Sequence, residues 1–219
     1  MYKKKSFFVT FEGIEGSGKS YQSIKLYKNL KKLKIFPILT REPGGTKGAE
    51  KIRNLILQDY FNFSPKDKFD KYTDTLLYLA ARNEHVRNKL KPSLLKKKVV
   101  LCDRFVDSTI AYQIYGKGVD NNFVNSIHKY ILKSLRPDLT FVLKVNLSKA
   151  MQRLRKRKIK NRYDKFSVKF YRKAQNSFLK LAKKNKKRYF VVDNSNDSPK
   201  IEKIIIKKFM SAYRKKWRI

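Results

Sequence analysis

The feature that most constrains this chain is a glycine-rich segment near its N-terminal end. The segment reads FEGIEGSGKS over residues 11–20 and fits the pattern G-x-x-x-x-G-K-[ST], from Gly13 to Gly18, Lys19 and Ser20. The apolar run at residues 6–11 is predicted to be a buried strand, and an amphipathic helix is predicted over residues 17–34. A strand, this loop and a helix in that order are the context that a phosphate-binding P-loop requires.

The backbone and side chains of this loop are suited to anions. Glycine reaches dihedral angles that other residues avoid, so successive N–H groups can converge on phosphate oxygens, and the following helix adds its dipole. Lys19 is expected to reach the outer phosphates and Ser20 to bind Mg²⁺. We therefore predict nucleotide binding, and a glycine-rich turn without a ligand is the weaker alternative. The predicted nucleotide-binding residues are Gly13, Glu15, Gly16, Ser17, Gly18, Lys19 and Ser20.

Apolar strands alternate with helical patterns along the rest of the chain. After the first strand, strands are predicted at 36–40, 99–102, 139–145 and 188–193. Helices are predicted at 46–58, 74–91, 108–115, 121–135, 167–184 and 199–213. This alternation predicts an α/β fold, a five-stranded parallel sheet flanked by helices, with ligands beyond the carboxyl ends of the strands. Pro37 cannot donate a ladder hydrogen bond, so the second strand should lie at a sheet edge.

The length and the charge of the chain limit its class. We expect a single domain over residues 1–219, long enough to bury a core. Lysine and arginine total 55 against 17 acidic residues, a formal net charge of +38. The lysines are scattered over nearly every predicted helix, which favours solvated helix faces over a nucleic-acid-binding surface, although a polyanionic partner stays open.

Other functional classes are less compatible with the sequence. No apolar run approaches the roughly 18 residues of a membrane span, and no signal-peptide pattern is present, so we expect a cytoplasmic protein. The single cysteine, Cys102, lies in a predicted strand and is expected in the core. His85 and His128 have no metal-ligand spacing, which makes zinc chemistry improbable.

Four further segments carry a family resemblance. TREPGGT (40–46), LLYLAARNEH (76–85), CDRFVDSTIAYQ (102–113) and RPDLTFVL (136–143) follow the P-loop in this order. Together they resemble bacterial-type thymidylate kinases, which are P-loop nucleoside monophosphate kinases. The resemblance implies a P-loop NTPase fold with a basic lid, transfer of the γ-phosphoryl group of Mg²⁺-ATP to dTMP for dTTP synthesis, and a homodimer. The alternatives are another pyrimidine nucleotide or deoxynucleoside kinase, and a basic nucleic-acid-binding protein.

The resemblance implies roles at the acceptor nucleotide. Glu15 matches an acidic residue that accepts a hydrogen bond from the sugar 3′-hydroxyl, and a buried acceptor of this kind rejects analogues that lack the hydroxyl. Arg53 matches an arginine that holds the acceptor phosphate. Tyr78, usually phenylalanine in the family, matches a ring that stacks on thymine, and Arg82 matches an arginine that bonds the base. The implied substrate-binding residues are Glu15, Arg41, Glu42, Arg53, Tyr78, Arg82, Arg104, Ser108, Thr109, Tyr112 and Gln113.

A second group is implied for metal binding and phosphate transfer. Asp103 and Arg104 follow the third strand, where a carboxylate can organise Mg²⁺ beside Ser20 and an arginine can fork onto phosphate. By resemblance, Glu42 lies near the magnesium ion, which gives the metal set Ser20, Asp103 and Glu42. Glu12 is expected to pair with a basic neighbour rather than to contact the ligand.

The arginine-rich segment RLRKRKIKNRYDKF (153–166) resembles the lid of these enzymes, and we place a mobile lid at about 153–165. Gly16 stands where the other subtype of the family carries a catalytic arginine. Because phosphoryl transfer depends on charge neutralisation, the missing cation is expected from the lid. Asn161 replaces the aspartate that is usual before the lid arginine. The implied catalytic residues are Lys19, Arg104, Arg153, Arg157 and Arg162.

Overall fold

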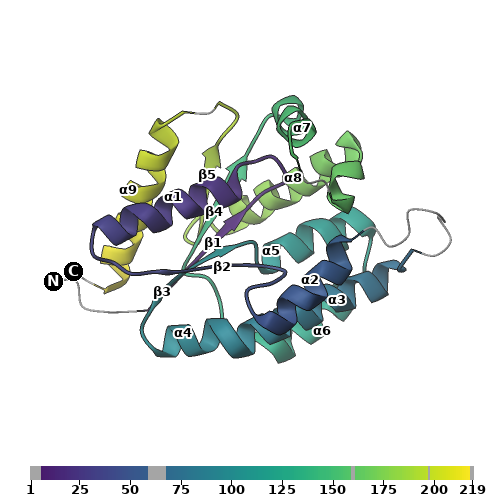
Figure 1. Ribbon diagram of the computed structural model, residues 1–219, viewed down its shortest axis with the longest axis horizontal. Coiled ribbons are helices and arrows are strands. Elements are labelled where there is room, and N and C mark those ends of the chain that lie inside the picture. Colours follow the sequence, from purple (N-terminus) through teal and green to yellow (C-terminus); the bar gives the residue numbers. More distant parts are fainter. Residues whose placement is uncertain (1–5, 59–67, 159–160, 197, 218–219) are drawn as a thin grey trace.

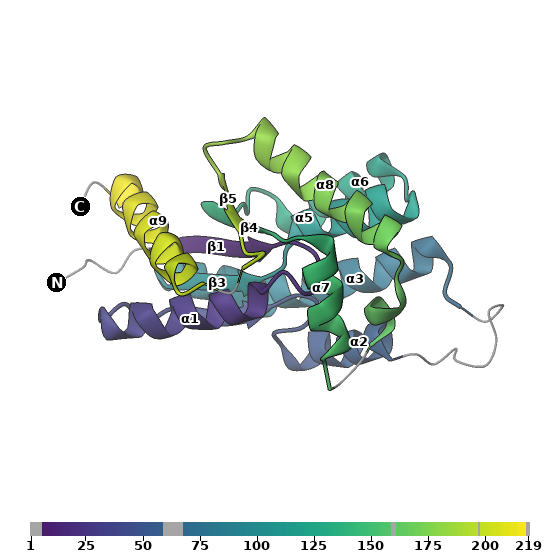
Figure 2. The same cartoon turned by 90° about the horizontal axis from the view of Figure 1, so that it is seen from above.

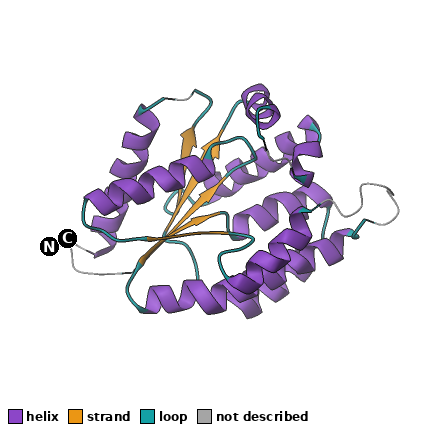
Figure 3. Cartoon of the chain, viewed as in Figure 1, coloured by secondary structure: helices purple, strands orange, loops and turns teal. Residues whose placement is uncertain are grey.

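The computed structural model describes residues 6–58, 68–158, 161–196 and 198–217, and a five-stranded sheet lies at its centre (Figure 3). Neighbouring strands pair in parallel, as the sequence predicted, and their spatial order is β2-β3-β1-β4-β5. The strands are β1 (Phe7–Glu12), β2 (Ile38–Arg41), β3 (Val99–Asp103), β4 (Leu139–Lys144) and β5 (Tyr189–Asp193). The edge position predicted for the second strand is confirmed, because β2 pairs with β3 on one side alone among the described residues.

Helices cover both faces of the sheet (Figures 1 and 2). Phe7, Val9 and Phe11 of β1 pack in one apolar cluster with residues of α1 (Lys19–Lys32) and α9 (Lys200–Trp217). Phe8 points to the other face, into a cluster that includes Leu79 of α3 (Lys71–His85). Both faces of the central strand are therefore apolar, which is why its sequence is a continuous apolar run instead of an alternation.

Six further α-helices lie within the described residues. They are α2 (Lys47–Leu57), α4 (Lys91–Leu95), α5 (Val106–Thr109), α6 (Asn121–Leu132), α7 (Leu147–Arg155) and α8 (Val168–Lys184). Two π-helical segments, Val86–Leu90 and Ile110–Gly116, continue α3 and α5. The helix predicted over 74–91 is thus three joined segments, and it begins three residues earlier, at Lys71, where Asp70 caps it. The apolar periodicity placed the element correctly but carried no signal for the changes in helix type.

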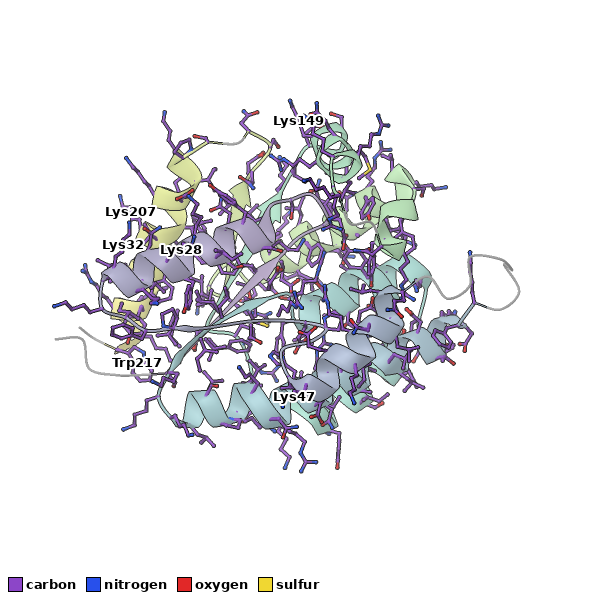
Figure 4. All side chains as sticks on the ribbon, viewed as in Figure 1. Lys28, Lys32, Lys47, Lys149, Lys207 and Trp217 are labelled. Atoms are coloured by element: carbon purple, nitrogen blue, oxygen red, sulfur yellow. The ribbon has the colours of Figure 1, made fainter. Side chains whose placement is uncertain are left out.

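The positive charge is spread over the surface and does not gather on one element. Figure 4 labels exposed lysines on separate elements, among them Lys28 of α1, Lys47 of α2, Lys149 of α7 and Lys207 of α9. This distribution agrees with solvated helix faces. None of the described helices combines the length and the apolar character that a bilayer crossing needs.

Candidate active site

The P-loop connects β1 to α1, and its glycines adopt the conformations that the motif requires. Gly13, Gly16 and Gly18 have φ of 138°, 71° and 86°, where side chains bearing a Cβ are strained. A Cβ at Gly16 would also lie 2.6 Å from the backbone oxygen of Ala150 in α7. The loop therefore packs too closely against α7 to carry an arginine at this position.

Lys19 is buried at the start of α1 and is held by its own loop. Its Nζ donates to the backbone oxygen of Ile14 at 2.7 Å and lies 3.5 Å from Ser17 Oγ. Burial, followed by the nearby Arg104 guanidinium, lowers the pKa of Lys19 to about 8. An anionic ligand would offset both effects, so this ammonium is available to a phosphate.

Ser20 and Asp103 meet where β3 ends beside α1. The Ser20 hydroxyl donates to Oδ2 of Asp103. The second carboxylate oxygen, Oδ1, is buried and has no hydrogen-bond partner among the described residues. A hydroxyl beside a carboxylate with a spare oxygen is a donor set that suits Mg²⁺ with bound waters, because this ion prefers hard oxygen ligands and keeps several waters. The described residues contain no cluster of three or more His, Cys, Asp or Glu side chains that could hold a metal by themselves.

Arg104 follows Asp103 and links the P-loop to the acceptor side. Its Nη2 lies 2.6 Å from Glu15 Oε1, and its Nη1 donates to the backbone oxygen of Gly13 and to Ser108 Oγ, both at 3.0 Å. The Tyr112 hydroxyl donates to the other oxygen of Glu15. Burial alone would raise the pKa of Glu15, but Arg104 and Lys19 hold it below its usual value. The carboxylate is therefore charged, and Glu15 lines the cavity described below.

The carboxylate of Glu42 is occupied by two side chains of α3. Its Oε2 accepts from Arg82 Nε at 2.8 Å and its Oε1 accepts from His85 Nδ1 at 2.9 Å. Burial would raise the pKa of Glu42, but Arg82 and His85 lower it. The resemblance implied a place for Glu42 near the magnesium ion, with Ser20 and Asp103. In the structure its two carboxylate oxygens bond to Arg82 and His85 instead.

Arg82 is fixed by the same network. Its remaining bonds run to Thr109 Oγ1 at 2.8 Å, His128 Nε2 at 2.6 Å and the backbone oxygen of Phe105 at 3.0 Å. With the bond to Glu42, four of the five N–H groups of the guanidinium donate to protein acceptors. Burial and the adjacent Arg82 lower the pKa of His128 to about 3, so this imidazole is a neutral acceptor.

Two polar atoms at the predicted base-binding end of the site are buried without a partner among the described residues. They are Gln113 Nε2 and the hydroxyl of Tyr78. Gln113 is 2% exposed and Tyr78 8% exposed, and both line the cavity described next. A buried amide that lacks a partner costs free energy, and a ligand acceptor would remove that cost. Gln113 is therefore the residue whose geometry most directly indicates a ligand.

One cavity of about 770 Å³ joins the P-loop to this base end. Most of the predicted site residues line it, and three do not: Gly13, Ser17 and Arg162. The predicted site residues that line it are Glu15, Gly16, Gly18, Lys19, Ser20, Arg41, Glu42, Arg53, Tyr78, Arg82, Asp103, Arg104, Ser108, Thr109, Tyr112, Gln113, Arg153 and Arg157. The cavity is large enough for a nucleotide next to the phosphates of another.

Two arginines from the β2–α2 region lie at the rim of this cavity. The Arg41 side chain is 54% exposed and pairs with Glu50 at 3.0 Å. Arg53 donates to the backbone oxygen of Pro43 at 2.8 Å and is more buried. Exposed ion pairs are weak, so Arg41 can leave Glu50 at little cost.

The lid arginines are used in three different ways. Arg153 donates to the backbone oxygens of Gly16 and Asn194, at 2.8 and 2.9 Å, and so ties α7 to the P-loop. Arg157 lines the cavity. Arg162 forms an ion pair with the buried carboxylate of Asp74 on α3, and the catalytic role that we expected for it stays a prediction. Residues 159 and 160 of the expected lid lie outside the described residues.

Sequence reasoning missed several residues that build the site. His128 lies on α6, far along the chain from Arg82, and no pattern in the sequence connects them. His85 stands three residues after Arg82 on α3, a helical spacing that could have indicated it. Asn194 follows β5 and donates to the backbone oxygen of Ser17 at 2.8 Å. A polar residue just after a parallel strand was the available signal for Asn194.

Glu12 contacts different partners from those predicted. Its carboxylate accepts from the backbone N–H of Phe105 at 2.7 Å and from Ser108 Oγ at 2.6 Å, and not from a basic side chain. Cys102 is buried in β3 as expected, and burial raises the pKa of its thiol.

A P-loop at the carboxyl edge of a parallel sheet, opening into a polar cavity with free donor and acceptor atoms, defines the class as P-loop nucleotide-binding phosphotransferases. The sequence matches the family profile described as thymidylate kinase over residues 11–205. The chain belongs to the thymidylate kinase family.

Individual relatives agree with this assignment. The chain is 40% identical to a thymidylate kinase of Sulfurihydrogenibium sp., over 91% of this chain and 95% of the relative. It is 42% identical to a thymidylate kinase of a Wolbachia sp. from Brugia malayi, over 80% of each chain. Among solved structures, it is similar to the thymidylate kinase of Ehrlichia chaffeensis, with a TM-score of 0.72 and 35% identity over 94% of this chain and 99% of that one.

Proposed function

We propose that this chain is a dTMP kinase, which transfers the γ-phosphoryl group of ATP to a phosphate oxygen of dTMP and releases dTDP and ADP for dTTP synthesis. The observation that carries the proposal is the single cavity that joins Lys19 of the P-loop to the unpartnered amide of Gln113. The family and the names of the relatives agree with it.

The donor nucleotide is assigned to the P-loop end. The glycine-supported loop and the N-terminus of α1 bind its β- and γ-phosphates, and Lys19 exchanges the Ile14 carbonyl for a phosphate oxygen. Ser20 and Asp103 would hold Mg²⁺, which supplies charge neutralisation at these phosphates. We leave Glu42 out of the metal set, because its two oxygens bond to Arg82 and His85.

The acceptor nucleotide is assigned to the other end. Gln113 donates to a base carbonyl, the Tyr78 ring packs on the base, and the fixed Arg82 presents one flank of the pocket. Glu15 faces the sugar hydroxyl, and Arg53 and Arg104 meet the phosphate. Thr109 and Ser108 line this pocket but already bond to Arg82, Glu12 and Arg104, so they support those residues more than they read the base.

The chemistry needs no protein nucleophile. The acceptor phosphate oxygen is already anionic, so a bond forms from it to the γ-phosphorus as the bond to the β,γ-bridging oxygen breaks. Lys19 and Arg104, with a lid arginine such as Arg157, neutralise the charge that the two phosphates bring together. Lys19 is buried and Arg104 is largely shielded from solvent, which strengthens their effect relative to water.

The homodimer expected from the family is part of this proposal. Leu55 of α2 and Leu76 of α3 are exposed apolar side chains on helices that pack side by side. We propose that this surface packs against a second copy, which light scattering on the purified protein can test with Leu76→Lys. A cytoplasmic location also stays a proposal, supported by a single, buried, unpaired thiol at Cys102.

The proposed activity is tested by ADP release coupled to NADH oxidation, with ATP and one acceptor at a time: dTMP, dUMP, UMP or thymidine. We expect ADP release to depend on dTMP and to be lost in Lys19→Ala. Lys28→Ala, an exposed lysine on the same helix, is the matched control and should retain the wild-type rate. A wild-type protein that phosphorylates thymidine alone, or none of the four, contradicts the proposal.

A further inference from the structure

The backbone at Arg104 is in an unusual conformation. Arg104 has φ of 70°, in the left-handed region that residues with a side chain seldom adopt. Such a conformation costs free energy and persists where the surroundings impose it, often next to a functional site. The turn comes directly after β3, and the Arg104 N–H donates to the Phe11 backbone oxygen at 2.9 Å. The structure must therefore contain groups that hold this turn.

The buried carboxylate of Glu12, at the end of β1, holds both the backbone of this turn and, through Ser108, the Arg104 side chain. One oxygen accepts from the backbone N–H of Phe105 at 2.7 Å, which fixes the peptide that follows Arg104. The other accepts from Ser108 Oγ at 2.6 Å, and Ser108 Oγ accepts in turn from Arg104 Nη1 at 3.0 Å. The backbone and the guanidinium of Arg104 are thus both connected to one side chain.

The stability of the fold does not account for a carboxylate in this place. Glu12 is fully buried, and its two hydrogen-bond partners, an amide and a hydroxyl, carry no charge. Burial, with the carboxylate of Asp107 nearby, raises the pKa of Glu12 to about 7, although Ser108 and Arg104 oppose the rise. Burying a carboxylate in this way is costly, and an apolar side chain would avoid that cost.

We propose that Glu12 is a positioning residue that orients Arg104 for phosphoryl transfer, through Ser108 on one side and the Phe105 amide on the other. This inference rests on the proposed function, because it assumes that Arg104 contacts the transferring phosphate. It also gives Ser108 a new role, as the link between Glu12 and Arg104 and not as a reader of the base.

Replacement by glutamine separates this role from the space that the side chain fills. Glutamine has nearly the same shape, but it offers one acceptor oxygen and an NH₂ donor. In Glu12→Gln the amide oxygen can still accept from the Phe105 N–H, but the NH₂ group then faces Ser108 Oγ, so the Ser108 hydroxyl loses its acceptor and must rotate away. The expected result is a displaced Arg104 with the fold preserved, and displacements of this kind can lower rates by about 10- to 100-fold.

The test compares kcat, KM and thermal unfolding in wild type, Glu12→Gln, Arg104→Ala and the double variant. We expect Glu12→Gln to lower kcat about 10-fold or more, with KM for ATP changed less than about 2-fold, because the P-loop contacts remain. In the Arg104→Ala background the same substitution should change kcat by less than about 2-fold, since the group that it positions is absent. The same loss of kcat in both backgrounds overturns the proposal.

Two further variants test whether the loss of kcat in Glu12→Gln is a purely structural effect. Asp107→Asn removes another buried carboxylate, which bonds to Arg188 at 2.5 Å and to the Tyr189 hydroxyl at 2.9 Å but not to the Arg104 turn. It should lower the unfolding temperature and leave kcat within about 2-fold of wild type. Ser108→Ala is expected to fold normally and to lower kcat about 3- to 10-fold, with Ser108→Thr restoring it.

The outcomes also separate this inference from the proposed function. If Glu12→Gln does not fold, Ser108→Ala decides, and a wild-type kcat in that variant overturns the positioning role. A wild-type protein that makes no dTDP removes the proposed function itself. An active wild-type enzyme with an unaffected Glu12→Gln variant removes the positioning role alone.

Discussion

At the P-loop end of the cavity, Lys19 donates to a carbonyl of its own loop, whereas at the base end Arg82 donates through four of its five N–H groups to protein acceptors. Both cations are buried and both line the same cavity. The Lys19 contact can be exchanged for a phosphate oxygen. The Arg82 contacts cannot be given up without leaving Glu42 as a buried, partly unpaired charge.

The difference shows that two buried cations in one site can have different roles, one in binding the ligand and one in maintaining the structure of the pocket. Lys19 is a movable charge whose burial makes it costly until an anion arrives. Arg82 is a structural residue of the cavity lining. Its network with Glu42, His85, Thr109 and His128 gives the pocket a fixed shape. Substitutions at Lys19 should therefore change activity, and substitutions in the Arg82 network should change stability first.

The largest expected effect is the loss of catalysis in Lys19→Ala. Removal of a charge that stabilises the transition state should lower kcat about 10³-fold. The free energy of unfolding should not fall, because a buried ammonium with a lowered pKa is replaced by a small apolar side chain. Steady-state kinetics and urea unfolding of the same preparation measure both quantities. A strongly destabilised Lys19→Ala variant would show that Lys19, like Arg82, also stabilises the fold.

The second effect is a loss of stability in Arg82→Ala. Breaking a buried ion pair and leaving Glu42 uncompensated should cost about 3–5 kcal/mol in the free energy of unfolding. Arg41→Ala is the matched control, since its pair with Glu50 is exposed and should be worth less than about 1 kcal/mol. Urea unfolding distinguishes the two variants. Equal losses in the free energy of unfolding would contradict the distinction between the buried Arg82 network and the exposed Arg41 pair.

A smaller effect is expected from pH, through His128. Its pKa is about 3 in the folded protein and 6.5 when exposed, so the unfolded state binds more protons between these values. Its contribution to stability is therefore complete well above pH 6.5 and is lost as the pH falls towards 3, by about 1–2 kcal/mol near pH 5.5. In His128→Gln, which keeps an acceptor for Arg82, unfolding measured across this range should depend less on pH. An unchanged dependence would place the titration elsewhere.

The smallest effect is expected from Tyr78→Phe. The hydroxyl is buried without a hydrogen-bond partner among the described residues, so its removal should change the free energy of unfolding by less than about 1 kcal/mol. The ring that packs on the base is retained, and KM for dTMP should stay within about 2-fold of wild type. A large rise in KM would mean that the hydroxyl itself contacts the acceptor nucleotide.

The two ends of the cavity also differ in how far the sequence predicts them. The P-loop residues are contiguous, so one motif gives the strand, the turn, Lys19 and Ser20 together. The base end is assembled from β2, α3, α5 and α6, and the pairing of Arg82 with Glu42 joins positions 40 residues apart. Arg82 was predicted as a base contact from resemblance, but its four bonds to protein acceptors depend on packing that no local pattern encodes.

Other contacts could not be predicted for the same reason, because they join residues that lie far apart in the chain. Ser108 and Glu12 are 96 residues apart, and neither periodicity nor charge indicates their hydrogen bond. The ion pair between Arg162 and the buried Asp74 likewise joins positions that no local pattern connects. The parallel strands and the edge position of β2 were predictable, because the apolar runs and Pro37 are local signals, whereas the order of the strands in the sheet was not predicted.

The most direct test of the account is a crystal structure with dTMP and ADP bound. The account predicts that the thymine lies within hydrogen-bond distance of Gln113 Nε2 and against the Tyr78 ring, while Lys19 Nζ has left the Ile14 carbonyl for a phosphate oxygen. A structure in which dTMP binds outside this cavity, or in which Lys19 keeps its contact with Ile14 while ADP is bound, would contradict it.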